Sequence, residues 1–325
     1  SEMKMRKPVS LLTLLFFVSV TACAQRVPNM NDSHHGASSP SPADAAETQD
    51  WAKARLAKSP RHQEWVKVKN GAREVNSFVV YPEVKTKATA VIVIHEIFGM
   101  SDWVQSLTDQ LAEAGYIAIA PDLLSGMGPN GGGTSSLDRT QIGQKIRDLP
   151  PDQITADLNA VADYVSKLPA ANGKVVVTGY CWGGSQSFRF ATNNPNIKAA
   201  YVFYGSAPMI GSDGTVDKEA LARIKAPVYG FYAGNDARIN ATLPATTQAM
   251  SELKKKFEPV TYEGAGHGFM RAGEAPEPED TTAADYQKNL DTWRLNRKAR
   301  DEAWARWKKL LAAHGKKAGI FRGLT

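Results

Sequence analysis

A cysteine lies between glycines in the stretch Gly179–Gly184, which reads Gly-Tyr-Cys-Trp-Gly-Gly. The β-branched run at residues 174–178 is typical of a buried strand, and residues 185–191 have the pattern of a helix that ends before Pro195. A cysteine on a tight turn between a strand and a helix matches the nucleophile elbow, with Cys where Ser is commoner. The helix dipole at such a turn favours the thiolate. The alternative is a buried structural cysteine beside a glycine-rich turn.

An acidic residue and a histidine follow two later strands, where each would reach the cysteine. Asp236 lies in the turn after the strand expected at residues 227–233, and His267 follows the one expected at 259–262. The order nucleophile, acid, histidine is that of the α/β-hydrolases. Carboxyl ends of parallel strands share one edge of a sheet, so the sequence predicts a triad of Cys181, Asp236 and His267. Taken singly, Asp236 would fit a helix N-cap and His267 a surface loop.

The elements that must position these residues alternate regularly from Glu64 onward. Residues 65–68 and 75–81 predict an antiparallel pair around a turn at Asn70-Gly71. Further strands are expected at residues 90–94, 116–120, 174–178, 199–204, 227–233 and 259–262, and helices at residues 103–114, 151–168, 243–257 and 285–313. This alternation predicts an α/β fold, a doubly wound and mostly parallel sheet with helices on both faces.

Composition restricts the classes of function. The chain has 325 residues, 42% of them hydrophobic, and a formal charge of +6. No run rich in lysine or arginine stands out, so the sequence does not predict a nucleic-acid partner. The two cysteines, Cys23 and Cys181, form neither a disulfide framework nor a metal cluster. We therefore expect no metal and no organic cofactor.

The amino-terminal residues have the pattern of an export signal. Lys4, Arg6 and Lys7 precede an apolar stretch at residues 9–20, which is too short to span a bilayer comfortably. The segment Val20-Thr21-Ala22-Cys23 resembles a bacterial lipobox, in which Cys23 would carry lipid. Cleavage after Ala24 is the alternative. Either outcome predicts export, and the protein would be periplasmic or lipid-anchored in a bacterial envelope.

Domain boundaries follow from these patterns. Residues 1–24 are expected to be the signal peptide, with a lipoprotein signal ending before Cys23 as one form of it. Residues 25–60 are rich in Ser, Pro, Ala, Asp and Asn, and predict a flexible tether with at most a short helix near residues 51–56. Residues 61–325 would form the catalytic domain with a carboxyl-terminal amphipathic helix.

Five stretches between about residues 65 and 271 resemble the dienelactone hydrolase family of α/β-hydrolases. They are His95–Gly99, Gly115–Leu123, Gly179–Gly184, Gly234–Asp236 and Gly264–Phe269. The resemblance implies Cys181 as the nucleophile, His267 as the base and Asp236 as the residue that orients it. It also implies that Glu96 is paired with the resting thiol and helps to deprotonate it, and that the backbone N–H groups of Ile97 and Trp182 form the oxyanion hole. The alternative for Glu96 is a loop carboxylate in water.

One family feature is only half present. Arg271 matches one of the two arginines that bind a substrate carboxylate in this family, whereas residues 124–127 contain no counterpart of the other. Arg139 and Arg147 are the candidates to replace it.

The resemblance implies a hydrolase of small esters or lactones that works through an acyl-enzyme. Its partner would be a small-molecule substrate, with no nucleic acid and with membrane contact only through a lipid anchor at Cys23. We expect a monomer. The alternatives are an exported binding or structural lipoprotein with vestigial activity, and a peptidase or acyltransferase on the same scaffold.

Overall fold

The computed structural model describes residues 49–211 and 213–315. An eight-stranded sheet forms its centre, with the strand order β1-β2-β4-β3-β5-β6-β9-β10. β1 and β2 pair in antiparallel fashion, as do β2 and β4, and all the other pairs are parallel. The strands are β1 (Gln63–Asn70), β2 (Arg73–Val80), β3 (Ala88–Ile94), β4 (Ile117–Pro121), β5 (Ala171–Tyr180), β6 (Ala200–Phe203), β9 (Val228–Ala233) and β10 (Phe257–Tyr262), with a separate small pair β7 (Met209–Ile210) and β8 (Thr215–Val216).

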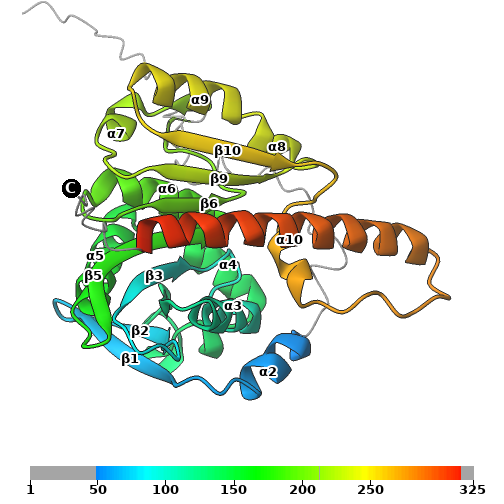
Figure 1. The fold of residues 1–325 in the computed structure, drawn as a ribbon, viewed down its shortest axis with the longest axis horizontal. Coiled ribbons are helices and arrows are strands. Elements are labelled where there is room, and N and C mark those ends of the chain that lie inside the picture. Colours follow the sequence, from blue (N-terminus) through cyan, green and yellow to red (C-terminus); the bar gives the residue numbers. More distant parts are fainter. Residues whose placement is uncertain (1–48, 212, 316–325) are drawn as a thin grey trace, which may run out of the picture.

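Helices cover both faces of this sheet (Figure 1). The helices are α2 (Asp50–Ala57), α3 (Asp102–Glu113), α4 (Arg139–Arg147), α5 (Pro151–Ser166), α6 (Trp182–Asn193), α7 (Lys218–Ala222), α8 (Ala237–Asn240), α9 (Leu243–Glu252) and α10 (Tyr286–Gly315), with single 3-10 turns η2 (Pro129–Gly131), η3 (Thr134–Ser136) and η4 (Phe269–Gly273). α5 and α6 contribute to the apolar core on one face, and α3 and α10 to the core on the other. The predicted α/β fold with a mostly parallel sheet is therefore confirmed.

Strand β3 shows why the sheet is buried on both faces. Its sequence Ala-Thr-Ala-Val-Ile-Val-Ile has no charged residue, and every position in it is buried. Ile92 and Ile94 point to the core beneath α5 and α6, whereas Val91 and Val93 point to the core beneath α3 and α10. A strand of this composition is stable only between two layers of helices, which places its carboxyl end in the interior of the molecule.

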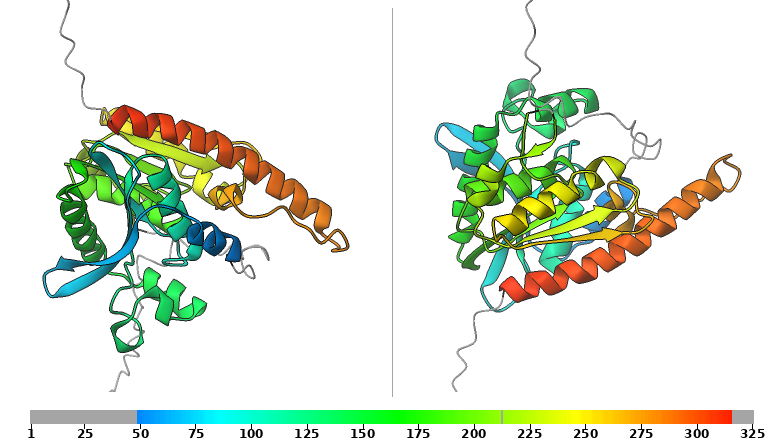
Figure 2. Two further views of the ribbon diagram at one scale, coloured as in Figure 1. Left: turned by 60° about the horizontal axis from the view of Figure 1, so that its bottom comes forward. Right: turned by 90° about the horizontal axis from the view of Figure 1, so that it is seen from above.

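Helix α10 is the longest element, and the aromatic residues at its carboxyl half hold it on the sheet. Trp307 is fully buried, with its ring centre 5.1 Å from that of Phe203 and 6.0 Å from that of Tyr201. Phe203 in turn stacks on Phe231 at 4.2 Å. The amino-terminal half of α10 extends beyond the rest of the fold (Figure 2). The amphipathic helix predicted for residues 285–313 thus packs mainly through its carboxyl half.

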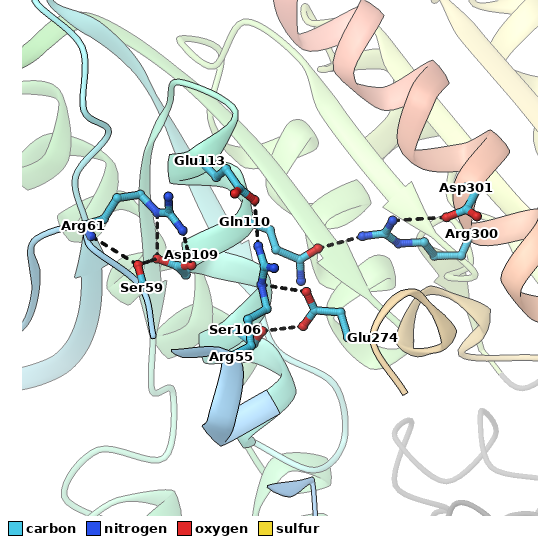
Figure 3. A network of polar contacts seen from close by, with 10 residues as sticks. All are labelled: Arg55, Ser59, Arg61, Ser106, Asp109, Gln110, Glu113, Glu274, Arg300 and Asp301. Carbon is cyan, nitrogen blue, oxygen red and sulfur yellow. Dashed lines mark hydrogen bonds and ion pairs between the residues drawn. The ribbon is translucent and has the colours of Figure 1, made fainter. Parts of the chain in front are cut away.

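The folded part of the chain begins before residue 61, where the sequence predicts the start of the catalytic domain. The short helix expected near residues 51–56 is α2, and it packs on α3 through Trp51 and Leu56 and through charged contacts. Figure 3 shows Arg55 between Glu113 of α3 and Glu274, with ion-pair distances of 2.7 Å to each. Residues 50–60 therefore belong to the folded body rather than to a tether. The apolar residues of this eight-residue helix do not gather on one face, so its sequence carries too weak a periodicity to reveal this packing.

One helix is shorter than its sequence suggests. The helix expected at residues 243–257 ends at Glu252, because Lys254 adopts a left-handed conformation with φ 55° and the chain then enters β10 at Phe257. The predicted signal peptide, Cys23 and the tether up to residue 48 lie outside the described residues. No helix among the described residues is long and apolar enough to cross a membrane.

Replacing Trp307 by alanine should cost about 3–5 kcal/mol of the free energy of unfolding, because it empties the centre of the aromatic cluster under α10. The matched control is Trp65→Ala, since Trp65 is 50% exposed and its loss should cost less than about 1 kcal/mol. Urea unfolding followed by circular dichroism measures both. Equal losses in the two variants would show that α10 is not held by this cluster.

Candidate active site

Cys181 stands at the turn between β5 and α6, where the sequence places the elbow. Its backbone has φ 56° and ψ −120°, and its N–H donates to the carbonyl of Phe203 at 3.1 Å. The turn is tight because two glycines allow backbone to touch backbone. A Cβ on Gly179 would lie 1.8 Å from the carbonyl oxygen of Gly183, and a Cβ on Gly183 would lie 2.3 Å from that of His95. The elbow therefore brings the sulfur to the carboxyl ends of β3 and β5.

Asp236 and His267 meet at the same edge of the sheet. Asp236 caps α8, with its Oδ1 accepting from the N–H of Ile239 at 3.4 Å, and its Oδ2 lies 2.5 Å from Nδ1 of His267. The sequence allows Asp236 to be either a helix N-cap or the partner of His267. In the structure the carboxylate of Asp236 has both roles. Asn296 of α10 accepts from the N–H of Gly266 at 2.8 Å and so holds the loop that carries His267. Sequence analysis did not identify Asn296.

His267 lies between a carboxylate and a sulfur. Burial lowers the pKa of His267, but the negative charge on Cys181, hydrogen bonds to Asp236 and Cys181, and the charge of Asp236 outweigh this, and the result is a pKa raised to about 10. Burial raises the pKa of Asp236, but the hydrogen bond and charge of His267 bring it below its usual value. This arrangement favours the protonated imidazolium of His267 next to the Asp236 carboxylate.

The two amides expected to hold an oxyanion lie on either side of Cys181. Trp182 is the first residue of α6, and Ile97 follows the end of β3 by three residues. Both residues line the cavity that contains Cys181. Among the described residues, neither N–H donates to a backbone acceptor. An oxyanion hole at these two amides stays a prediction.

Glu96 and Arg271, expected in different roles, are hydrogen-bonded to each other. Glu96 is only 2% exposed, and Nη1 of Arg271 donates to its Oε2 at 3.1 Å. Burial of a carboxylate is costly without a charged partner, so this arginine compensates Glu96. Arg271 was expected from the family to bind substrate. A pairing of two groups 175 positions apart could not be read from either motif.

A second arginine, Arg139, lies near the same aromatic ring as Arg271. The guanidinium carbon of Arg139 lies 4.8 Å from the ring centre of Phe98, and that of Arg271 lies 5.8 Å from it. Both arginines line the cavity, as does Arg147. Arg139 and Arg271 therefore both lie within cation–π range of the same ring at the wall of the cavity.

The cavity is an open groove of about 2240 Å³ that brings together residues from most of the chain. Its lining includes Cys181, His267, Tyr204 and, from the amino-terminal segment, Gln49 and Trp51. The ring of Tyr204 meets the ring of His267 edge to face at 5.0 Å, on a backbone with φ 41°. Among residues 49–211 and 213–315, no group of three or more His, Cys, Asp or Glu side chains is placed to hold a metal ion.

An eight-stranded sheet of this order, with a cysteine elbow at the end of β5 and an acid and a histidine after β9 and β10, defines an α/β-hydrolase. The model of the dienelactone hydrolase family matches residues 75–315, and the chain belongs to that family. It is therefore a hydrolase of the kind that acts on lactone or ester bonds.

Two bacterial relatives carry the name "Putative carboxymethylenebutenolidase". The one from Yersinia pestis is 31% identical over 67% of this chain and 82% of its own length, and the one from Salmonella typhi is 32% identical over 62% and 75%. The crystal structure of a "Putative Dienelactone Hydrolase" from Klebsiella pneumoniae superimposes with a TM-score of 0.62 at 25% identity, covering 78% of this chain and 98% of that one.

The raised pKa of His267 predicts how its ring titrates. In the wild type the imidazole should stay protonated through neutral pH and lose its proton near pH 10. In Cys181→Ala one source of negative charge is gone, so the pKa should fall toward the ordinary value of about 6.5. Nitrogen-15 NMR of labelled histidine measures both proteins.

The sign of the stability effect follows from the same shift. The pKa of His267 is raised on folding, so its contribution to the free energy of unfolding is complete below about pH 6.5 and is lost as the pH rises toward 10. An identical titration in the wild type and in Cys181→Ala would show that the sulfur does not act on His267.

Proposed function

We propose that this protein hydrolyses small esters or lactones through a Cys181–His267–Asp236 triad and an acyl-enzyme. The observation that carries the proposal is the position of His267, which is hydrogen-bonded to both Cys181 and Asp236 beside an open cavity. A histidine placed in this way can take a proton from the nucleophile while the carboxylate fixes its tautomer and orientation.

Acylation follows from this geometry. The Cys181 thiolate attacks the substrate carbonyl, a carbon–sulfur bond forms, and the carbonyl electron pair moves to the oxygen. The amides of Ile97 and Trp182 hold that oxygen. The imidazolium of His267 then gives its proton to the leaving alcohol as the carbon–oxygen bond breaks.

His267 acts as an acid in acylation and as a base in deacylation. Once Cys181 is acylated, its negative charge is gone, and one of the causes that raise the pKa of His267 disappears. The ring is then a neutral base that takes a proton from water as the water oxygen bonds to the thioester carbon. The carbon–sulfur bond then breaks, which releases the carboxylic acid and returns Cys181 as the thiolate. Acylation by itself thus converts His267 from an acid into a base.

The arginines next to the nucleophile bear on the substrate. In this proposal Arg139 and Arg271, which both lie close to Phe98, favour a substrate with a negative group near the scissile bond. Arg271 would then divide its charge between that group and Glu96, which is its partner in the structure. Glu96, released in part by the substrate, would help to deprotonate Cys181 in the manner that the family resemblance implies.

Replacing Cys181 by alanine should abolish hydrolysis of p-nitrophenyl acetate with little change in stability, because the thiol is half-exposed at the elbow. Cys181→Ser should retain little activity, since a hydroxyl is far less acidic than a thiol. In Cys23→Ala, whose one remaining thiol is Cys181, loss of activity should match the amount of iodoacetamide bound, one per chain. Turnover at the wild-type rate in Cys181→Ala would refute the triad, and an inert but folded wild type would favour vestigial activity.

We further propose that the protein is exported and that Cys23 carries the lipid, because a short apolar stretch ends at a lipobox-like segment. Mass spectrometry of protein purified from a bacterium that processes lipoproteins should show a lipidated Cys23 as the first residue. The matched control, Cys23→Ala, should lose the lipid and keep the hydrolase activity. An unlipidated chain beginning at Gln25 would keep export and reject the lipid, and an unprocessed chain would reject both.

A further inference from the structure

His95 is fully buried directly before Glu96, and the hydrolytic mechanism above gives it no part. Its Nδ1 lies 2.8 Å from the carbonyl oxygen of Glu96, and its Nε2 lies 3.4 Å from the N–H of Leu123. A carbonyl can only accept and an amide N–H can only donate. These partners therefore fix the neutral tautomer with the proton on Nδ1.

The carbonyl that His95 holds belongs to the same peptide unit as the N–H of Ile97. In a trans peptide the C=O and the N–H point in opposite directions, and the structure has no cis bond among its described residues. A donor on the Glu96 oxygen thus fixes the direction of the Ile97 N–H and polarises it. The N–H of Gly99 also donates to this oxygen, at 3.1 Å. The Glu96 carbonyl thus accepts two hydrogen bonds, one from the His95 side chain and one from a backbone N–H.

His95 also contacts the residue that supplies the second amide. Its ring stacks on that of Trp182, with the centres 5.6 Å apart and the planes 15° from parallel. The backbone of His95 lies against Gly183, where the close approach of β3 and α6 leaves no space for a side chain. Burial lowers the pKa of His95 against the opposing charge of Asp122, which keeps the ring neutral.

We propose that His95 is a positioning residue that aims the Ile97 amide at the oxyanion and holds it in register with the Trp182 amide. It touches neither substrate nor sulfur in this role. The inference rests on the proposed thiol hydrolysis and deepens it, since it names what keeps the two amides aligned before substrate arrives.

Two substitutions separate the two hydrogen bonds of the ring. His95→Asn keeps an N–H donor near the position of Nδ1, which faces the Glu96 carbonyl. His95→Gln keeps an acceptor near the position of Nε2, which faces Leu123. Both variants lose the stacking on Trp182 and keep a polar side chain, so each serves as the control for the other.

Hydrolysis of p-nitrophenyl acetate and alkylation by iodoacetamide should respond differently. Alkylation passes through no oxyanion, so its rate should stay within about twofold of wild type in both variants. Hydrolysis should fall at least about tenfold in His95→Gln, a part of the 100- to 1000-fold loss for removing a donor, and should be largely retained in His95→Asn. The loss should appear in kcat rather than in KM.

The outcomes are decisive in either direction. Unchanged hydrolysis in folded His95→Gln, or an equal loss of hydrolysis and alkylation in both variants, overturns the positioning role. A wild type whose hydrolysis survives complete alkylation of Cys181 overturns the proposed function together with this inference, so the two failures are distinguishable.

A measurement on the wild type covers the case in which His95→Gln does not fold. Butyraldehyde should add reversibly to Cys181: a carbon–sulfur bond forms and the carbonyl electron pair moves to an oxygen held by the two amides. The Nδ1–H resonance of His95 should then shift downfield as its hydrogen bond strengthens. A resonance unchanged by saturating aldehyde overturns the inference.

Discussion

The active site depends on the contact of bare backbone at the carboxyl ends of β3 and β5. Gly179 and Gly183 leave room for β5, the first turn of α6 and the end of β3 to meet without side chains between them. The atoms that an added Cβ would meet are backbone carbonyls, which cannot move aside. Any residue larger than glycine at either position would therefore force the end of β3, the end of β5 and the first turn of α6 apart.

This contact also explains where the structure carries backbone strain. Cys181 and Tyr204 have positive φ values of 56° and 41°, and they follow directly after the neighbouring strands β5 and β6. Such conformations cost free energy for residues with a side chain, and they persist when the surroundings dictate them. Here a buried aromatic cluster and the hydrogen bond from Cys181 to Phe203 hold both residues against His267. Two of the four non-glycine residues with positive φ in the described part of the chain thus lie beside the histidine.

The parts of the site that the sequence predicts are the local ones. An elbow, a strand run and a histidine after a strand each lie within a dozen residues, and parallel strands must bring their ends to one edge. The pairings across the cavity have no such local signal. Arg271 with Glu96, Asn296 with Gly266, and Arg55 with Glu274 depend on how loops and helices pack after the sheet has formed. His95 lay inside a quoted motif, but only its two partners reveal what it holds.

The described chain begins near the carboxyl ends of the parallel strands and ends near their amino ends. This affects how the protein can be attached to a surface. Gln49 lines the cavity and accepts a hydrogen bond from the first turn of α3 at 2.8 Å, so the chain joins the fold at the rim of the groove. At the other end, His314 of α10 contacts the hydroxyl of Tyr229 at 3.0 Å, near the amino end of β9. A support coupled at residue 49 would therefore lie beside the groove, whereas one coupled at residue 314 would lie near the amino end of β9.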